Sequence, residues 1–177
     1  MKRTIKYLAA VLAAVSMLSV TACGGDNAQN DNSSSAGTVS QDSASQNTDN
    51  TVASPSDITA KIKEDIEFPS MADVSARTAD YYDIDADKIE SVSAFICGSG
   101  AAPDEIAVFK LASSDDVAAA KEALEARAAK QKASFEDYKP DEVYKFGENV
   151  VSKGQYVALI ICADNSAAIS VFNSMAQ

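Results

Sequence analysis

The sequence predicts an α+β domain, with helices packed on a mostly antiparallel four-stranded sheet. An apolar run at residues 7–20 and a polar stretch up to residue 55 leave one domain-sized segment, residues 56–177. Within that segment, stretches with apolar residues at helical spacing are mixed with stretches in which apolar residues alternate or run together. Their order is ααββαββα, which is typical of helices covering a sheet built from hairpins.

Two helices are predicted at the start of the domain. Ser56 or Asp57 supplies a cap for the first, because short polar side chains accept hydrogen bonds from the first helical N–H groups. Its apolar edge consists of Ile58, Ile62 and Ile66. Residues 68–71, which contain Pro69, end this helix, and residues 72–82 form the second.

Two hairpins supply the predicted strands. The strands cover residues 90–97, 105–111, 150–152 and 155–162. Residues 98–103 form the loop of the first hairpin, and Lys153-Gly154 forms the turn of the second. The strand at 105–111 is apolar on both faces except at Lys110, so we expect it in the middle of the sheet.

The longest predicted helix starts at Ser113 or Ser114 and ends near Tyr138, because Pro140 disfavours helix at the residue before it. Its inward-facing residues, at spacings of three and four, are Val117, Ala120, Leu124, Ala128, Gln131 and Phe135. A last helix covers residues 165–175, with Ala168, Val171, Phe172 and Met175 facing inward.

The amino terminus has the pattern of a bacterial lipoprotein signal. A basic start and the apolar run lead to Val20-Thr21-Ala22-Cys23, which fits the lipobox order of aliphatic, small, small and Cys. We therefore expect residues 1–22 to be a signal peptide and Cys23 to carry diacylglycerol and an acyl chain such as palmitate. An ordinary signal peptide or an uncleaved anchor is the alternative. Residues 23–55 are rich in Ser, Asn, Asp and Gly, which predicts a disordered tether.

Charge and composition exclude several classes of function. Removal of residues 1–22 leaves 12 basic and 26 acidic residues, a net charge of −14. Such a balance argues against nucleic acid as a partner, because nucleic-acid binding needs a basic patch. The chain has no His, the commonest general base and metal ligand. We expect no metal and no cofactor, and we read the acidic stretch at residues 83–87 as a solvated turn, because Lys88 replaces the Gly that a calcium loop requires.

A set of short motifs appears in a recognisable order. The motifs are Phe68-Pro69-Ser70-Met71, Tyr82 with Ile84-Asp85, Asp104-Glu105-Ile106, Arg127, Gln131, Phe135 and Tyr138 with Pro140, and Gly154 with Tyr156. Over residues 58–175 the chain resembles the bacterial domain of unknown function numbered 4358, which occurs on lipoproteins, chiefly of Gram-positive anaerobes. The resemblance implies an envelope location and no particular activity.

Four residues are candidates for a binding site: Arg127, Glu105, Gln131 and Tyr138. Arg127 flanks the inner stripe of an Ala-rich helix, where it either pairs with Glu105 or Asp104 within the fold or holds a ligand carboxylate or phosphate. No residue is assigned as catalytic. Cys97 and Cys162 both end strands of an exported domain, so they are either a disulfide pair or buried thiols.

Two classes of function remain. We expect a membrane-anchored lipoprotein on the extracytoplasmic face of the cell membrane, held there through the lipid on Cys23. It would serve as a non-enzymatic module that binds an envelope protein or a small-molecule ligand. The alternative is an envelope hydrolase that works without His, using carboxylates such as Glu105 with Tyr138 or Arg127.

Overall fold

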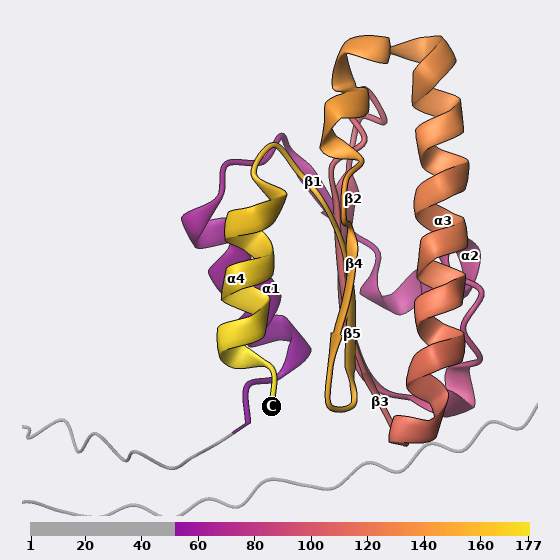
Figure 1. Ribbon diagram of the computed structural model, residues 1–177, viewed down its shortest axis with the longest axis vertical. Coiled ribbons are helices and arrows are strands. Elements are labelled where there is room, and N and C mark those ends of the chain that lie inside the picture. Colours follow the sequence, from indigo (N-terminus) through magenta and orange to yellow (C-terminus); the bar gives the residue numbers. More distant parts are fainter. Residues whose placement is uncertain (1–51) are drawn as a thin grey trace, which may run out of the picture. The chain divides into compact units, whose positions relative to one another are not determined.

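The computed structural model describes residues 52–177, which form a five-stranded antiparallel sheet with helices on both faces (Figure 1). In chain order the elements are α1 (Pro55–Asp65), β1 (Met71–Asp73), α2 (Thr78–Tyr81), β2 (Ile89–Cys97), β3 (Glu105–Leu111), α3 (Val117–Tyr138), β4 (Val150–Lys153), β5 (Tyr156–Ile161) and α4 (Asn165–Met175). The strand order across the sheet is β1-β2-β3-β5-β4, and every neighbouring pair is antiparallel.

The predicted α+β class is confirmed, whereas the predicted number of strands is wrong. Residues 71–73 form β1 and pair with the end of β2, although residue 71 was predicted in the break between the helices and residues 72 and 73 at the beginning of the second helix. Pro69 disfavours helix just before this segment, and Gly98 N–H donates to the Ser70 carbonyl at 2.9 Å, which anchors the segment to the sheet edge. The second helix is consequently reduced to one turn, α2, preceded by a 3₁₀ turn.

The sheet separates two apolar cores. In Figure 1, α1 and α4 lie together on one side of the sheet, and α2 and α3 lie on the other. Alternation along β3 serves both cores: Ala107, Phe109 and Leu111 face α3, and Ile106 and Val108 face α1 and α4. The prediction that β3 is central is confirmed, since it is the third of the five strands.

The start of α1 is capped two or three residues earlier than predicted. Ser54, rather than Ser56 or Asp57, is the cap: its hydroxyl accepts from the Asp57 N–H at 3.2 Å, and Asp57 accepts from the Ser54 N–H at 2.9 Å. Pro55 fits the first helical position, where no N–H is needed. The Tyr156 hydroxyl donates to the Ala53 carbonyl at 2.9 Å, so β5 holds the beginning of the described chain.

The predicted inner stripe of α3 is confirmed. Ala120, Leu124 and Phe135 are buried, and Val117 and Ala128 pack against the same core. The helix ends at Tyr138, as Pro140 predicts. None of the helices between residues 52 and 177 combines the length and hydrophobicity that a bilayer-spanning helix requires.

The β4–β5 hairpin turns at Gly154, whose φ is +57°. Gly100, in the β2–β3 loop, has a similar φ of +67°. A Cβ atom on Gly154 would lie 2.9 Å from the Gln177 carbonyl oxygen, whereas one on Gly100 would have nothing within 4 Å. The turn and the carboxyl terminus are therefore in close contact.

We predict that Gly100→Ala lowers the free energy of unfolding by about 1 kcal/mol, the cost of a left-handed Ala. Gly154→Ala should lower it further, because the Cβ atom also meets Gln177. Deleting Gln177 from the Gly154→Ala variant should reduce its loss of unfolding free energy to that of Gly100→Ala. Urea denaturation measures all three variants, and equal losses for the two single variants would contradict the contact.

Candidate functional site

Two adjacent acidic residues are buried where the central strand begins. Asp104 precedes β3 and is 2% exposed, and Glu105 is its first residue and is fully enclosed. Glu105 shares the α3 face of the strand with Ala107 and Phe109, and alternation turns Asp104 away from that face. A buried carboxylate is unfavourable unless it is paired, so each of these residues needs a cation.

Arg127 of α3 supplies the cation for Glu105. Its Nη2 lies 2.8 Å from Oε2, and its Nε lies 3.3 Å from Oε1, so both carboxylate oxygens are bound. The Arg127 side chain is 21% exposed. Burial alone would lower the pKa of Arg127, but the hydrogen bonds and charge of Glu105 outweigh it and raise that pKa. The two contacts tie α3 to the start of β3.

Tyr82, which is not among the four residues predicted from the sequence, completes this cluster. Its ring packs edge-on against Phe109, with centroids 5.2 Å apart, and only 3% of the residue is exposed. Burial and the neighbouring Glu105 carboxylate raise the pKa of the Tyr82 phenol far above its ordinary value. Its hydroxyl makes no hydrogen bond with another described residue. The only sequence signal for Tyr82 was its place in the family motifs.

A hollow of about 220 Å³ lies on this flank of α3, where the exposed part of Arg127 reaches the surface. Its lining consists of Asp80, Tyr81, Asp83, Ala123, Ala126, Arg127 and Lys130. The guanidinium carbon of Arg127 lies 5.8 Å from the centroid of the Tyr81 ring, within the range of a cation–π contact. The hollow thus carries both signs of charge and suits a small polar group.

Gln131 and Tyr138, the other two predicted residues, lie in different surroundings. Gln131 donates to the Pro103 carbonyl at 2.9 Å, so the structure joins it to the start of β3, as it does Arg127. Tyr138 is 64% exposed and packs edge-on against Phe135 at the end of α3. The structure therefore brings three of the four candidates together and leaves Tyr138 at the surface.

Lys145, which is not among the four residues predicted from the sequence, supplies the cation for Asp104. It ends the 3₁₀ helix Pro140–Lys145, and its Nζ lies 2.7 Å from Asp104 Oδ2 and 2.8 Å from Glu142 Oε2. Burial lowers the pKa of Lys145, but the two carboxylates outweigh it and raise that pKa. The hydrogen bond from Lys145 is also the largest cause of the lowered pKa of Glu142.

Two amides fix the backbone at this point. The Asn149 and Asn165 side chains donate to the Lys145 carbonyl at 3.0 Å and 2.6 Å, and Asn149 also donates to the Ile160 carbonyl at 2.7 Å. The segment between α3 and β4 is therefore attached both to β5 and to the beginning of α4. The only local sequence signal was Glu142, three residues before Lys145.

Cys97 and Cys162 are both free and buried, so the disulfide alternative is not formed. The register explains why. Cys97 ends β2 and Cys162 follows β5, with β3 between them. Two strand spacings separate their Cα atoms by about 10 Å, more than the 7 Å that a disulfide allows. Burial raises the pKa of Cys162 to about 11, which keeps this thiol protonated.

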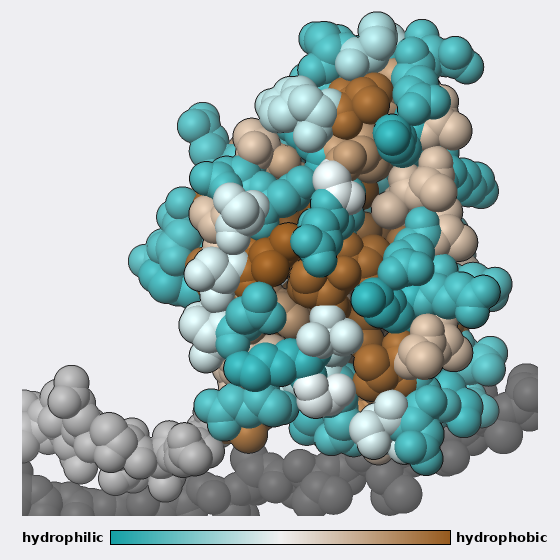
Figure 2. Space-filling model, in the orientation of Figure 1, coloured by the Kyte–Doolittle hydropathy of each residue, from teal (hydrophilic) through white to brown (hydrophobic). Residues whose placement is uncertain are grey.

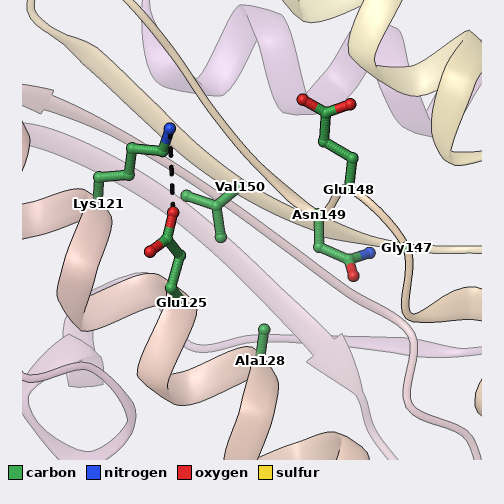
Figure 3. Close-up of a pocket in the computed structure, with 7 residues that line it drawn as sticks. All are labelled: Lys121, Glu125, Ala128, Gly147, Glu148, Asn149 and Val150. Carbon is green, nitrogen blue, oxygen red and sulfur yellow. Dashed lines mark ion pairs between the residues drawn. The ribbon is translucent and has the colours of Figure 1, made fainter.

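A second hollow, of about 280 Å³, separates α3 from the chain that leads into β4 (Figure 3). Its lining consists of Lys121, Glu125, Ala128, Gly147, Glu148, Asn149 and Val150. Lys121 and Glu125 form an ion pair of 3.9 Å on the helix wall. Figure 3 shows Glu148 directed away from α3. The polar rim and the small side chain of Ala128 make this an open groove rather than an enclosed pocket.

The acidic stretch at residues 83–87 leads into a 3₁₀ turn, Ala86–Lys88. Lys88 Nζ lies 3.2 Å from Asp116 Oδ1. Among the residues from 52 onward, no three Asp, Glu or Cys side chains converge as metal ligands.

The family model of a domain of unknown function, DUF4358, matches residues 63–162, more than half of the chain. The chain belongs to this family. The match spans β1 to β5, and so includes both buried ion pairs of the DUF4358 domain. Neither the curated proteins nor the solved structures contain a match to this chain.

We predict that Arg127→Ala lowers the free energy of unfolding of the DUF4358 domain by about 3 kcal/mol, because it leaves the Glu105 carboxylate buried and unpaired. Combining Arg127→Ala with Glu105→Gln should cost less than Arg127→Ala alone. Lys121→Ala on the same helix removes an exposed pair and should cost less than about 0.5 kcal/mol. Urea denaturation measures the free energy of unfolding of each variant. A decrease for Arg127→Ala no larger than that for Lys121→Ala would contradict the role of Arg127 in pairing with buried Glu105.

Tyr82 should make the DUF4358 domain sensitive to alkali. The pKa of Tyr82 is raised in the folded state, so above pH 10 the unfolded chain releases a proton that the folded chain keeps. The contribution of the protonated Tyr82 phenol to the free energy of unfolding is present below pH 10. It is lost as the pH rises, by up to about 1.4 kcal/mol per pH unit. Tyr82→Phe should flatten this decline without loss of stability at pH 7, since its hydroxyl is unpaired. Unfolding measured from pH 7 to 11 tests this, and identical slopes in both proteins would refute it.

Proposed function

We propose that this chain is a lipid-anchored module of the cell envelope that binds another molecule rather than transforming it. The proposal for the anchor rests on the lipobox at Val20–Cys23, which lies outside the described residues. The composition of residues 23–55 supports a tether that places the domain on the extracytoplasmic face. The membrane itself is the first partner, through the lipid on Cys23.

The observation that carries the choice of a binding module is the enclosure of Glu105. A general acid or base must lie within hydrogen-bond reach of the group it serves. Glu105 has no exposed surface, and Arg127 binds both of its carboxylate oxygens. The carboxylate that a His-free hydrolase would use is therefore engaged in holding the fold, and Tyr138 lies apart from it at the surface.

The titration of the other carboxyl groups agrees with this reading. A carboxyl that protonates a leaving group at neutral pH needs a raised pKa. Between residues 52 and 177, every carboxyl group with a displaced pKa has it lowered, by hydrogen bonds from neighbouring backbone or side-chain groups; these groups are Asp57, Asp73, Glu142 and Asp164. These carboxylates stay ionised and serve caps and ion pairs.

The surface favours contacts with a partner. The two hollows described above are small and open, and their charged residues have both signs. The described residues include 12 basic and 22 acidic ones, a net charge of −10. Such a surface attracts basic segments of other proteins and repels the anionic headgroups of a membrane. An envelope protein is therefore favoured over a second membrane contact.

We predict that Cys23→Ser moves the protein from the membrane fraction to the soluble fraction, because the acyl chains that hold it are not attached. Fractionation and immunoblotting of the expressing cells measure this. Ser19→Ala is the matched control, since it changes the apolar region but keeps the lipobox. Retention of the Cys23→Ser protein in membranes would refute the anchor.

Crosslinking of the tethered protein in its own membrane tests the binding role. A photoreactive residue in place of Glu148, beside the groove of Figure 3, should yield a discrete adduct with an envelope protein. The same residue in place of Glu64, on the exposed face of α1, is the control. Absence of any specific adduct, together with turnover of a muropeptide or glycan by the purified chain, would favour the hydrolase instead.

A further inference from the structure

The outer edge of β4 has unpaired backbone groups. β4 is the last strand of the sheet, with β5 on one side only. The Ile160 N–H donates to the Asn149 carbonyl at 2.8 Å, so residues 149 and 160 form a hydrogen-bonded pair. Bonded and non-bonded pairs alternate in an antiparallel ladder, and this directs the N–H and C=O groups of Val150 and Ser152 away from β5. None of these four groups bonds to another described residue.

β4 has only four residues, but this edge otherwise lacks the usual protection against pairing. Natural sheet edges are blunted by short strands, Pro, bulges or charged side chains. The opposite edge is β1, which has three residues and ends at Asp73. In β4 the one charged residue is Lys153, and its Nζ donates to the Asn173 carbonyl of α4 at 2.7 Å. Lys153 is thus held against α4 instead of guarding the edge.

Both faces of β4 offer apolar contacts to an added strand. Val150 belongs to the core under α3, and Val151 packs against the core under α1 and α4. Figure 2 shows apolar residues gathered in a band where Figure 1 places β4 and β5. On the α3 side, the groove of Figure 3 continues into a hollow of about 190 Å³ that reaches Phe146 and Lys132. Alternate side chains of an added strand would enter this groove.

We propose that the β4 edge binds an extended segment of another protein, which adds to the sheet as a sixth strand; this rests on the proposed binding role. Backbone hydrogen bonds give affinity in this mode, and pockets for alternate side chains give specificity. A four-residue edge falls short of the roughly 1,200 Å² that a stable dimer buries, and two domains of net charge −10 repel each other. A second copy of the chain is therefore the weaker occupant.

The charges beside the edge define the segment further. Lys121 and Lys132 are paired within α3, with Glu125 and Glu136. Glu148 is exposed and has no ion-pair partner among residues 52–177. The bound segment therefore combines apolar residues at alternate positions with Lys or Arg near Glu148.

Amide hydrogen exchange of the full chain in detergent micelles tests the proposal, with an eight-residue peptide of alternating Val and Lys as the probe. The peptide should slow exchange at Val150 and Ser152 at least tenfold, while Val151 and Lys153, already bonded to β5, change little. A peptide of alternating Val and Glu should bind more weakly. Unchanged exchange at Val150 and Ser152 with the Val–Lys peptide overturns the proposal.

A matched pair of variants identifies the backbone group. Ser152→Pro removes the outward N–H but no bond to β5, and should weaken probe binding about tenfold, the effect of one hydrogen bond. Ser152→Ala keeps that N–H and should bind as the natural chain does. Slow exchange at Val151 in both variants shows that the hairpin is intact. If Ser152→Pro exchanges fast at Val151, its hairpin is not intact, and the proposal is then decided by the effect of the peptide on exchange in the natural chain.

The remaining outcomes separate the two proposals. Slowing at Val150 and Ser152 that depends on protein concentration without peptide assigns the edge to a second copy and overturns the inference. An envelope adduct that persists in the Ser152→Pro chain, without peptide-dependent slowing, overturns the edge but keeps the binding module. Peptide-dependent slowing of exchange at Val150 and Ser152 without any envelope adduct supports strand binding at the β4 edge and counts against a role in the envelope.

Discussion

The burial of two adjacent carboxylates at the start of β3 is the constraint on which the rest of the structure depends. Asp104 and Glu105 are buried where the central strand begins, and an unpaired charge there would be strongly unfavourable. Each therefore requires its own cation, and the two cations come from consecutive elements, Arg127 from α3 and Lys145 from the segment after it. These two pairs set how α3 lies along the sheet and where the chain returns to form β4.

Buried ion pairs of this kind give specificity more than stability. Replacing both partners by apolar residues is often neutral, whereas removing one leaves an isolated charge. An apolar face of α3 alone, built on Ala120 and Leu124 with many small residues between, could slide along the sheet. The bidentate contact of Arg127 with Glu105 and the bond from Gln131 to Pro103 permit only one position.

The sequence predicted what depends on periodicity and missed what depends on pairing across the chain. The strand at residues 105–111, the end of α3 at Tyr138 and the helix at 165–175 follow from local patterns and were found. β1 was missed because three residues with little alternation form a strand only when β2 offers an edge. Lys145 and Tyr82 were missed because the carboxylates near them, Asp104 and Glu105, lie 41 and 23 positions away in the numbering.

The proposed binding edge lies away from the ionisable side chains that are most noticeable in the sequence. The two most noticeable of these residues, Glu105 and Arg127, bind each other and so hold α3 on the sheet. What the described domain leaves open is backbone, at the edge of β4, with apolar residues and a groove beside it. A domain that recognises its partner through backbone hydrogen bonds and pockets for alternate side chains needs no catalytic residue and no histidine. It needs a rigid edge, and the Asn149 bonds to Lys145 and Ile160 provide one immediately before that edge begins.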